Sequence, residues 1–593
     1  MILVCGKVVN LYMKTFGRLK EFFLKNKWSY IVGLFWLLLV DAVQLLVPKI
    51  LGNLTDDFQN NILSTEGILK YAIYIVLTGA IIGLGRYFWR IYIIGNSRKL
   101  EYHLRKELFD HLLTLSPNYF NTHRTGDLMS HATNDINAVR QAMGFGIILM
   151  VDSIFLIILS LFMMIRTTSL KLTIIAIFNL PIIVFLTRRF GSVIYQRSKI
   201  VQGAFSDLTE TSQESFAGMR VIKSFVQEDL VSDNFNEVNK DNLDKNLALV
   251  RISGSFRPLL QFVFSISLFI TIFYGGKEVI RGNISLGSFI AFYTYLGLLN
   301  WPTRALGQVI NILQRGAASM DRINLILDED PEIVETENPI VTDINGYIQF
   351  KDVSFKYPNS NNYALSNINF TIEKGQTLAI LGRTGSGKST IADLLLRLYD
   401  IQEGSILIDN LEIKDLEFKT LRENIGYVPQ DNFLFSETIK DNIAFAFDNN
   451  IQEEQVFQAA KMAEVYDNIV EFPKSFNTIL GERGVTLSGG QRQRSSIARA
   501  LIKEPPILIL DDSLSAVDTE TEESILNNLD SFISNTTTII ISHRVSTIQN
   551  ADEIIFLDNG SIVERGTHDE LLNLNGFYKD LYEKQLLEEK IQG

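Results

Sequence analysis

Apolar residues are concentrated in the first half of the chain, in long runs separated by polar segments. Six runs approach the roughly 20 apolar residues that a helix needs to cross a bilayer core of about 30 Å. These runs cover residues 30–51, 68–91, 142–165, 172–186, 259–280 and 284–299. Apolar runs after residue 330 are far shorter. The pattern predicts an all-α polytopic membrane domain with six transmembrane helices, followed by a domain of another kind.

The second half has the pattern of an α/β domain. Residues 347–357 alternate apolar and polar positions, which is typical of a half-buried strand, and residues 377–381 and 507–511 are short apolar runs typical of buried strands. Residues 327–340 are acidic and contain two prolines, which indicates a linker. We therefore expect a membrane domain over 1–326, a linker over 327–345 and an α/β domain over 346–593.

The flanking charges predict the orientation in the membrane. Six Lys and Arg residues lie between Lys7 and Lys27, whereas the loop 52–67 contains none and carries three acids. Positive flanks stay on the cytoplasmic side, so the N-terminus is predicted to be cytoplasmic and six crossings return the chain there. The connections 95–141 and 188–257 are long and charged, and we expect helices that project into the cytoplasm. Met13 is an alternative start to Met1.

Several side chains inside the predicted spans are candidates for the transport pathway. Asp41 and Asp152 are carboxylates and Arg86 and Arg90 are cations at positions where charge is costly. Asp41 either lines a pathway or makes a structural pair, and the two arginines suit snorkelling or pairing. Aromatic residues suited either to an apolar cargo or to lipid-facing packing are Trp36, Phe269, Phe289, Phe292 and Tyr293.

Composition excludes several classes of protein. The 593 residues include one cysteine, Cys5, so an intrachain disulfide framework and a thiolate metal cluster are excluded. The six histidines lack metal-ligand spacing, which argues against a His-based metalloenzyme. The net charge of −12 argues against nucleic-acid binding. Mean hydropathy is +0.13 although 21% of residues are charged, which again indicates two unlike domains.

A phosphate-binding loop follows the apolar run 377–381. Its pattern is G-x-x-x-x-G-K-[ST] between a strand and a helix, in which backbone N–H groups cradle phosphates, the lysine binds the β- and γ-phosphates and the last hydroxyl binds Mg²⁺. The predicted ATP-binding residues here are Gly382, Arg383, Thr384, Gly385, Ser386, Gly387, Lys388, Ser389 and Thr390.

Two further segments complete a nucleotide site. The apolar run 507–510 is followed by Asp511, whose carboxylate suits binding of Mg²⁺ directly or through water. Asp512 comes next, at the position where a water-activating base would stand. Residues 487–491 read Leu-Ser-Gly-Gly-Gln and open a second helix whose N-terminus binds anions. One γ-phosphate does not need two such helices from one domain. We therefore expect ATP between the loop of one domain and the corresponding Ser488, Gly489, Gly490 and Gln491 of another.

With these motifs the sequence resembles ATP-binding cassette (ABC) transporters, specifically exporter half-transporters, over nearly its whole length. The resemblance implies that Tyr357 stacks on adenine, that Gln430 links Mg²⁺ and water to the membrane interface and that His543 contacts the γ-phosphate. It also implies that Ser515–Asp518 cross the dimer and that Gly481–Gly484 contact the inner loops. Residues 119–128 and 214–223 resemble the two inner loops, which in this family rest on the ATPase domains.

One departure from the family pattern concerns hydrolysis. The family's usual Glu after the strand Asp is Asp512, which is shorter by one methylene, roughly 1.5 Å. The resemblance is therefore to the degenerate-site subunit of heterodimeric bacterial multidrug exporters, whose partner chain supplies a catalytic Glu. The expected function is ATP-driven export of apolar or amphipathic compounds across the cytoplasmic membrane with ATP and Mg²⁺. A homodimeric exporter and an ATP-gated channel or regulatory subunit are the alternatives.

Overall fold

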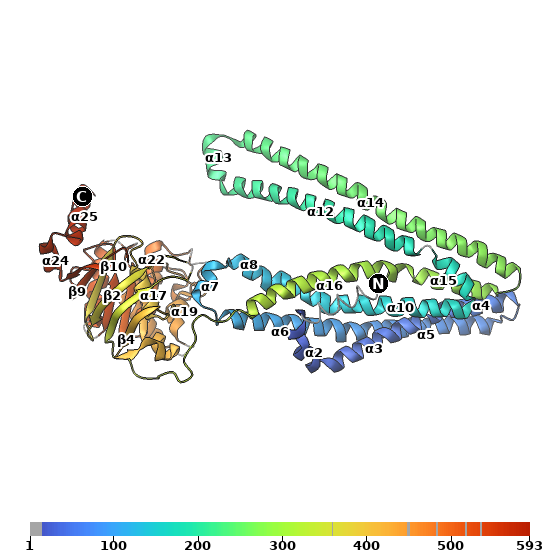
Figure 1. Ribbon diagram of the computed structural model, residues 1–593, viewed down its shortest axis with the longest axis horizontal. Coiled ribbons are helices and arrows are strands. Elements are labelled where there is room, and N and C mark those ends of the chain that lie inside the picture. The colour runs from blue at the N-terminus through green and yellow to red at the C-terminus, as the bar shows by residue number, and fades with distance from the viewer. Residues whose placement is uncertain are drawn as a thin grey trace. The chain divides into compact units, whose positions relative to one another are not determined.

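The structure is a computed structural model that describes residues 15–592 except Asn179, Asn359, 448–450, 482–483, 485, 516, 518 and 534–535. The chain forms two compact units. A helical unit comprises the chain up to Leu113 together with Thr125–Glu329, and an α/β unit comprises Thr114–Arg124 together with the chain from Asp330 onward. Figure 1 shows the helical ribbons of the first unit and the sheets of the second.

The helical unit is built of helices, several of them long. In chain order they are α2 (Lys20–Lys25), α3 (Lys27–Gln44), α4 (Leu46–Gln59), α5 (Thr65–Trp89), α6 (Gly95–Leu112), α8 (Thr125–Ser130), α9 (Ile136–Gln141), α10 (Ile147–Thr167), α11 (Leu170–Ile177), α12 (Leu180–Ala217), α13 (Met219–Phe225), α14 (Glu228–Ile280), α15 (Leu286–Leu298) and α16 (Asn300–Leu327). Short π-helical turns join them at η2 (Arg90–Ile94), η3 (His131–Asp135) and η4 (Ala142–Gly146).

Every predicted membrane span coincides with helix among the described residues. Four helical stretches are individually long and apolar enough to cross a membrane, namely Lys27–Gln59, Thr65–Leu112, Thr125–Thr167 and Glu228–Ile280. The predicted spans 172–186 and 284–299 lie in α11 with the start of α12 and in α15. This fold confirms the helical membrane domain expected from the apolar pattern.

Close packing of small residues joins α4 to α15. A Cβ on Gly287 would overlap the backbone oxygen of Gly52, so the two backbones touch only because both residues are glycine. Asp56 of α4 then accepts hydrogen bonds from the N–H of Gly287 and the hydroxyl of Ser285, both at 2.6 Å. A carboxylate at a helix N-terminus satisfies free N–H groups and complements the helix dipole, which fixes where α15 begins.

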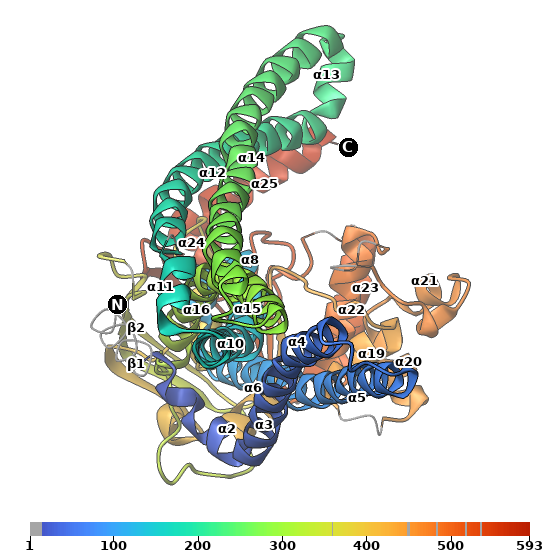
Figure 2. The ribbon, with the colours of Figure 1, turned by 90° about the vertical axis from the view of Figure 1, so that its right-hand side faces the viewer.

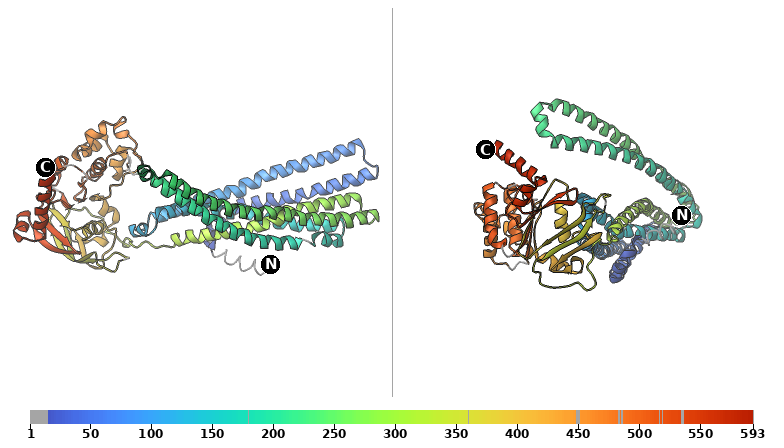
Figure 3. Two further views of the ribbon diagram at one scale, coloured as in Figure 1. Left: turned by 90° about the horizontal axis from the view of Figure 1, so that it is seen from above. Right: turned by 60° about the vertical axis from the view of Figure 1, so that its left-hand side comes forward.

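A long hairpin is formed by α12 and α14, with α13 at its tip (Figures 2 and 3). The two helices pack mainly on each other, and α14 also meets α11 and α15 at the other end of the hairpin. Large apolar side chains at the tip are exposed, with Phe216 at 74%, Phe225 at 71% and Val226 at 79%.

The α/β unit contains two sheets. The strands are β1 (Ile348–Phe355), β2 (Leu365–Ile372), β3 (Thr377–Gly382), β4 (Glu403–Ile408), β5 (Leu411–Glu412), β6 (Ile425–Val428), β7 (Ile507–Asp511), β8 (Thr537–Ile541), β9 (Glu553–Asp558) and β10 (Ser561–Gly566). One sheet has the order β2-β1-β4-β5 and the other β10-β9-β3-β8-β7-β6. In the larger sheet β3 pairs in parallel with β8 and β9, and β7 pairs in parallel with β6 and β8.

Helices surround these sheets and complete two apolar cores. They are α7 (Pro117–Thr122), α17 (Lys388–Leu395), α18 (Phe418–Glu423), α19 (Ile439–Ile443), α20 (Glu453–Met462), α21 (Tyr466–Val470), α22 (Gly489–Leu501), α23 (Thr519–Ile533), α24 (His568–Leu574) and α25 (Phe577–Gln592). One core lies between the two sheets and the other under α20 and α22. Strands β3, β7 and β8 are buried at every position and mainly apolar, as expected of parallel strands covered on both faces.

Candidate functional site: a nucleotide site at the carboxyl edge of the sheet

Four predicted site segments follow parallel strands of the same sheet. The phosphate loop follows β3, Asp511 ends β7, His543 comes two residues after β8 and Gln430 two residues after β6. The carboxyl ends of parallel strands meet at one edge, where ligands of α/β proteins bind. The topology therefore brings these distant segments of the sequence together.

Backbone conformation makes the phosphate loop a cradle. Gly385 and Gly387 have φ of +80° and +100°, and a Cβ on Gly387 would lie 2.5 Å from the carbonyl oxygen of Ala364. Lys388 folds over the loop, with its Nζ 2.9 Å from the carbonyl of Gly382 and 3.0 Å from that of Arg383. The hydroxyl of Ser386 is buried and has no hydrogen-bond partner. An unsatisfied donor beside a buried ammonium group fits a phosphate.

Charged groups cluster around this cradle. Burial lowers the pKa of Lys388, while the carboxylates of Asp511 and Asp512 act in the opposite sense. Burial also lowers the pKa of His543, and the nearby Lys388 adds to that effect. These mutual influences place the lysine, both carboxylates and the histidine in one site.

The donor set fits a magnesium ion held together with a phosphate. Asp511 is 2% exposed, burial raises the pKa of its carboxyl, and the hydroxyl of Ser389 hydrogen bonds to it. Among the described residues no group of three His, Cys, Asp or Glu side chains could hold a metal alone. A hydroxyl, a carboxylate and phosphate oxygens are the ligands that Mg²⁺ takes when it binds with a nucleotide.

The backbone of Asp512 is fixed from three sides. Its N–H donates to the carbonyl of Ile541 at 2.8 Å, and its own carbonyl accepts bonds from Gln493 at 3.1 Å and Ser515 at 3.0 Å. Its φ of +44° lies in the left-handed region, which Asp tolerates better than most residues. The amide of Gln430 is 3.4 Å from Oδ2 of Asp512. The side chain of Asp512 is therefore short, and the backbone from which it extends is held in place.

Tyr357 lies beside the start of α17. Its hydroxyl is 3.0 Å from that of Thr390 and 3.4 Å from Oδ2 of Asp393, and burial raises its pKa to about 12. Its ring packs edge-on against Tyr399, with centroids 5.1 Å apart. The ring remains partly exposed, as a platform for a purine requires.

Sequence reasoning missed Asp393 and Tyr399. Asp393 lies one helical turn after Ser389, so it shares a helix face with the phosphate loop's last hydroxyl, and this spacing was the available sign. Burial raises its pKa to about 6, and the nearby Asp511 adds to the effect. Tyr399 lies beyond α17 and reaches Tyr357 only through packing, which the sequence does not reveal.

The segment around α7 belongs to the α/β unit although it lies in the middle of the membrane half of the sequence. Ser116 and Asn118 donate to the carboxylate of Glu332 at 2.9 and 2.7 Å. Asn121 donates to the hydroxyl of Tyr399 at 3.2 Å. The first inner loop thus contacts a tyrosine that in turn packs on Tyr357.

Ser488 begins α22 with a capping box. Its hydroxyl accepts from the N–H of Gln491 at 3.2 Å, and Oε1 of Gln491 accepts from the N–H of Ser488 at 3.0 Å. Ser488 and Gly489 are exposed, and no hydrogen bond among the described residues links 488–491 to the phosphate loop. Asp518 and part of 481–484 lie outside the described residues.

Inside the helical unit, Asp41 of α3 is only 2% exposed. It interacts with Asp152 of α10 and Arg86 of α5, and its Oδ2 has no hydrogen-bond partner. Among the aromatic candidates Phe292 is fully buried, Trp36 stacks on Phe88 and Phe269 is 68% exposed. These side chains therefore do not form one common surface.

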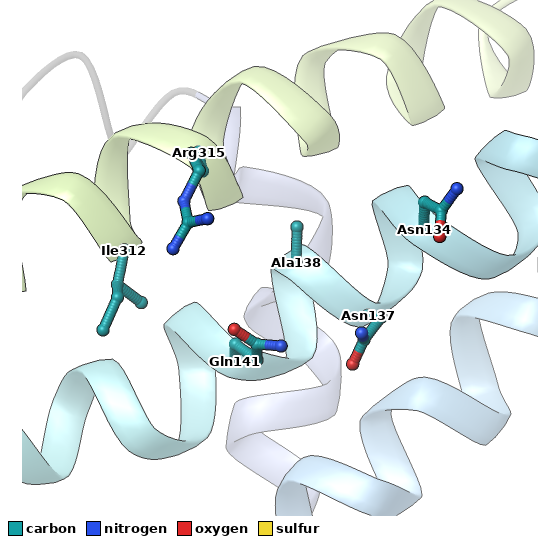
Figure 4. Close-up of a pocket in the computed structure, with 6 residues that line it drawn as sticks. All are labelled: Asn134, Asn137, Ala138, Gln141, Ile312 and Arg315. Carbon is teal, nitrogen blue, oxygen red and sulfur yellow. The ribbon is translucent and has the colours of Figure 1, made fainter. Parts of the chain in front are cut away.

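A polar pocket lies in the same unit where α16 passes η3 and α9 (Figure 4). Its volume is about 170 Å³. The side chains that line it are Asn134, Asn137, Ala138, Gln141, Ile312 and Arg315. Three carboxamides and a guanidinium group make this a pocket for polar groups, with room for a headgroup but not for a whole amphipathic molecule.

A helical membrane unit and a phosphate-loop ATPase unit in one chain define a membrane transport ATPase. The model of the ABC transporter transmembrane region matches residues 30–303, and the ABC transporter model matches residues 365–515. The chain belongs to the ABC exporter family. It is a membrane protein that binds ATP and couples its hydrolysis to transport, with the ATPase domain on the cytoplasmic side.

Several relatives are similar over almost their whole length. The chain is 42% identical to the probable multidrug resistance ABC transporter ATP-binding/permease protein YheI of Bacillus subtilis, over 95% of this chain and 97% of the relative. It is 38% identical to the multidrug resistance-like ATP-binding protein MdlA of Escherichia coli, over 97% of each chain. It is 38% identical to the ATP-dependent lipid A-core flippase of Aromatoleum aromaticum, over 87% of this chain and 85% of the flippase.

The fold also matches a solved structure, that of a bacterial Atm1-family ABC exporter with ATP bound. The TM-score is 0.77 at 27% identity, covering 94% of this chain and 98% of the other. A likeness over both units agrees with the exporter arrangement that the sequence motifs implied.

Proposed function

We propose that this chain is one half of a heterodimeric exporter of apolar or amphipathic compounds and that its own ATP site hydrolyses slowly. The observation that carries the proposal is Asp512. Its backbone is held by bonds to Ile541, Gln493 and Ser515. The missing methylene, roughly 1.5 Å of reach, cannot be recovered by a small backbone shift without breaking these bonds. Positioning of a general base is worth about 10²–10⁴ in rate.

The remaining site residues have the roles that hydrolysis and binding require. Lys388 and the N–H groups of 382–390 hold the phosphates, Tyr357 supports the adenine and His543 contacts the γ-phosphate. Ser389, Gln430 and Asp511 would hold Mg²⁺, which neutralises charge on the β- and γ-phosphates. The chain can therefore bind ATP tightly at a site where Asp512 activates water poorly.

A partner chain completes the arrangement. Ser488 and Gly489 are exposed, and no hydrogen bond among the described residues links 488–491 to this chain's own phosphate loop, so the N-terminus of α22 suits the phosphates held by another domain. The α12–α14 hairpin exposes Phe216, Phe225 and Val226 at its tip, which suits burial against a second subunit. Exporters of this family dimerise, and a partner with a catalytic Glu would hydrolyse ATP between its loop and this chain's Ser488. We retain residues 327–345 as the linker between the domains.

The proposed cargo class is supported by relatives named for multidrug resistance and for lipid A-core flipping. The pocket around Arg315 suits the polar end of an amphipathic molecule, and exposed aromatic residues such as Phe269 suit its apolar part. Transport proceeds by alternating access, because ATP can shift the equilibrium only by binding the closed and open states differently.

The test begins with co-purification of the tagged chain, which should recover a second half-transporter. In that complex Asp512→Asn should retain most of the steady-state ATPase activity, because the partner's Glu performs most turnovers. Asp512→Glu should raise hydrolysis, provided the partner's signature segment is functional. Complete loss of turnover in Asp512→Asn, with no partner recovered, would support the homodimer.

A gated channel makes a different prediction. Solute flux through reconstituted vesicles should then persist with a non-hydrolysable ATP analogue and follow the solute gradient. Flux of an apolar dye against its gradient, abolished when ATP is replaced by the analogue, supports the exporter.

A further inference from the structure

The C-terminal helix α25 contacts the segment that carries His543. The side-chain amide of Gln585 spans this segment: Nε2 donates to the carbonyl oxygen of His543 at 2.6 Å and Oε1 accepts from the N–H of Val545 at 2.8 Å. Both hydrogen-bonding ends of one side chain are therefore used on two peptide groups that flank Arg544. Such a bridge restrains the backbone torsions of Arg544 as a neighbouring strand would.

The other side of the same segment is held by α23. Glu522 is 4% exposed and accepts a hydrogen bond from Arg544 at 2.8 Å and another from the hydroxyl of Thr547. The segment 543–547 is thus fixed between a buried carboxylate on one helix and Gln585 on another. Removing Gln585 would release only the end that bears His543.

The first turn of α25 is anchored next to the phosphate loop. The guanidinium group of Arg383 lies 5.9 Å from the ring centroid of Phe577, which stacks on Phe556 of β9 at 5.8 Å. The N–H of Tyr578 donates to Glu564 at 2.9 Å. One helix therefore touches both the phosphate loop and the segment that bears the γ-phosphate histidine. It lies outside residues 365–515, which the ABC transporter model matches.

We propose that Gln585 is a positioning residue of the ATP site: it holds the backbone of His543 so that the imidazole meets the γ-phosphate. This inference rests on the role of His543 in the proposed function. Loss of one or two hydrogen bonds that orient His543 should weaken recognition of the γ-phosphate about five- to tenfold. It should leave the adenosine and the β-phosphate bound as before.

The experiment measures equilibrium binding of radiolabelled ATP and ADP to the purified full-length chain with Mg²⁺. The ATP-to-ADP affinity ratio should fall about five- to tenfold in Gln585→Ala, while ADP affinity stays unchanged. Gln585→Met keeps the length of the side chain without its hydrogen bonds and should behave in the same way, so it replaces the alanine variant if that variant does not fold. The exposed neighbour provides the control, and Lys584→Ala should match the wild type.

A double variant separates positioning from general destabilisation. If Gln585 acts through His543, Gln585→Met should change the ratio little once His543→Ala is present. An unchanged ratio in Gln585→Met, an equal loss of ATP and ADP binding, or full additivity with His543→Ala would each overturn the inference. A wild-type chain that binds ATP no better than ADP would instead contradict the role of His543 in the proposed function.

Discussion

Substituting Asp393 by Asn should make the ATPase unit more stable at neutral pH than at acid pH, relative to the wild type. Asp393 lies on α17, half-buried between the hydroxyl of Tyr357 and the carboxylate of Asp511. Burial, with a further contribution from Asp511, raises its pKa from 3.8 to about 6. Asparagine has a similar shape and no charge, so it removes the cost of ionisation and leaves an acceptor for Tyr357.

The magnitude and sign follow from linkage. A carboxyl whose pKa is raised in the folded state binds its proton more tightly there, so its contribution is complete below about pH 4 and is lost as pH rises through about pH 6. The shift of roughly two pH units corresponds to about 3 kcal/mol at most. At about pH 4.5 the unfolded carboxyl is already mostly ionised, so roughly 2 kcal/mol of this difference falls between about pH 4.5 and about pH 7.5. At about 2–4 °C per kcal/mol for a domain of this size, Asp393→Asn should gain up to roughly 4–8 °C over that range.

The assay is thermal unfolding of the purified, nucleotide-free chain in detergent at both pH values. The exposed Asp467→Asn substitution removes a carboxylate without this environment and should show no such pH-dependent gain. If Asp393→Asn and the wild type keep a constant difference in Tm across this range, Asp393 ionises without cost and the reasoning is refuted. Saturating Mg²⁺ and ATP should shrink the gain, because they offset the charge of Asp511.

Two further predictions concern ATP itself. Tyr357→Ala should weaken ATP binding by about 1–3 kcal/mol, whereas Tyr357→Phe keeps the ring and loses only the hydroxyl's contacts with Thr390 and Asp393. Equal affinities of both variants in a binding titration would exclude stacking on adenine. Ser488→Arg should abolish most ATPase activity of the assembled complex although this chain's phosphate loop is intact, and unchanged turnover in a verified complex would exclude the shared site.

The nucleotide site was predictable wherever a residue's position follows from its neighbours in sequence. The glycines of 382–387 and Lys388 form one local motif, and Asp511 comes directly after an apolar run, so its place at the carboxyl edge follows from strand pairing. Asp393 and Tyr399 reach Tyr357 only through the packing of α17 and the residues after it. Gln585 lies 40 residues from Val545 in the sequence, and no pattern in the neighbouring residues indicates the contact.

In the membrane half, too, the local sequence predicts one part of a helix and packing determines the rest. Hydropathy predicted the span 259–280, but α14 runs from Glu228 to Ile280 and passes through Pro258 without ending. Apolar composition marks only the part of a helix that lies in lipid, whereas the polar part continues because α12 packs against it. The predicted boundaries therefore mark the membrane-spanning part of α14 rather than the whole helix.

The contacts of α7 provide a physical route by which an inner loop can influence the nucleotide site. An inner loop can influence ATP binding only if its contacts differ in energy between conformations. Asn121 bonds to Tyr399, the ring of Tyr399 packs on that of Tyr357, and Tyr357 bonds to Thr390 at the start of α17. Movement of α7 that breaks the first contact removes a restraint on Tyr357, the proposed adenine platform, rather than on the phosphate loop. In the proposed site the phosphates are instead recognised by 382–390 and His543, so the proposal has loop position and γ-phosphate recognition acting on opposite ends of the same nucleotide.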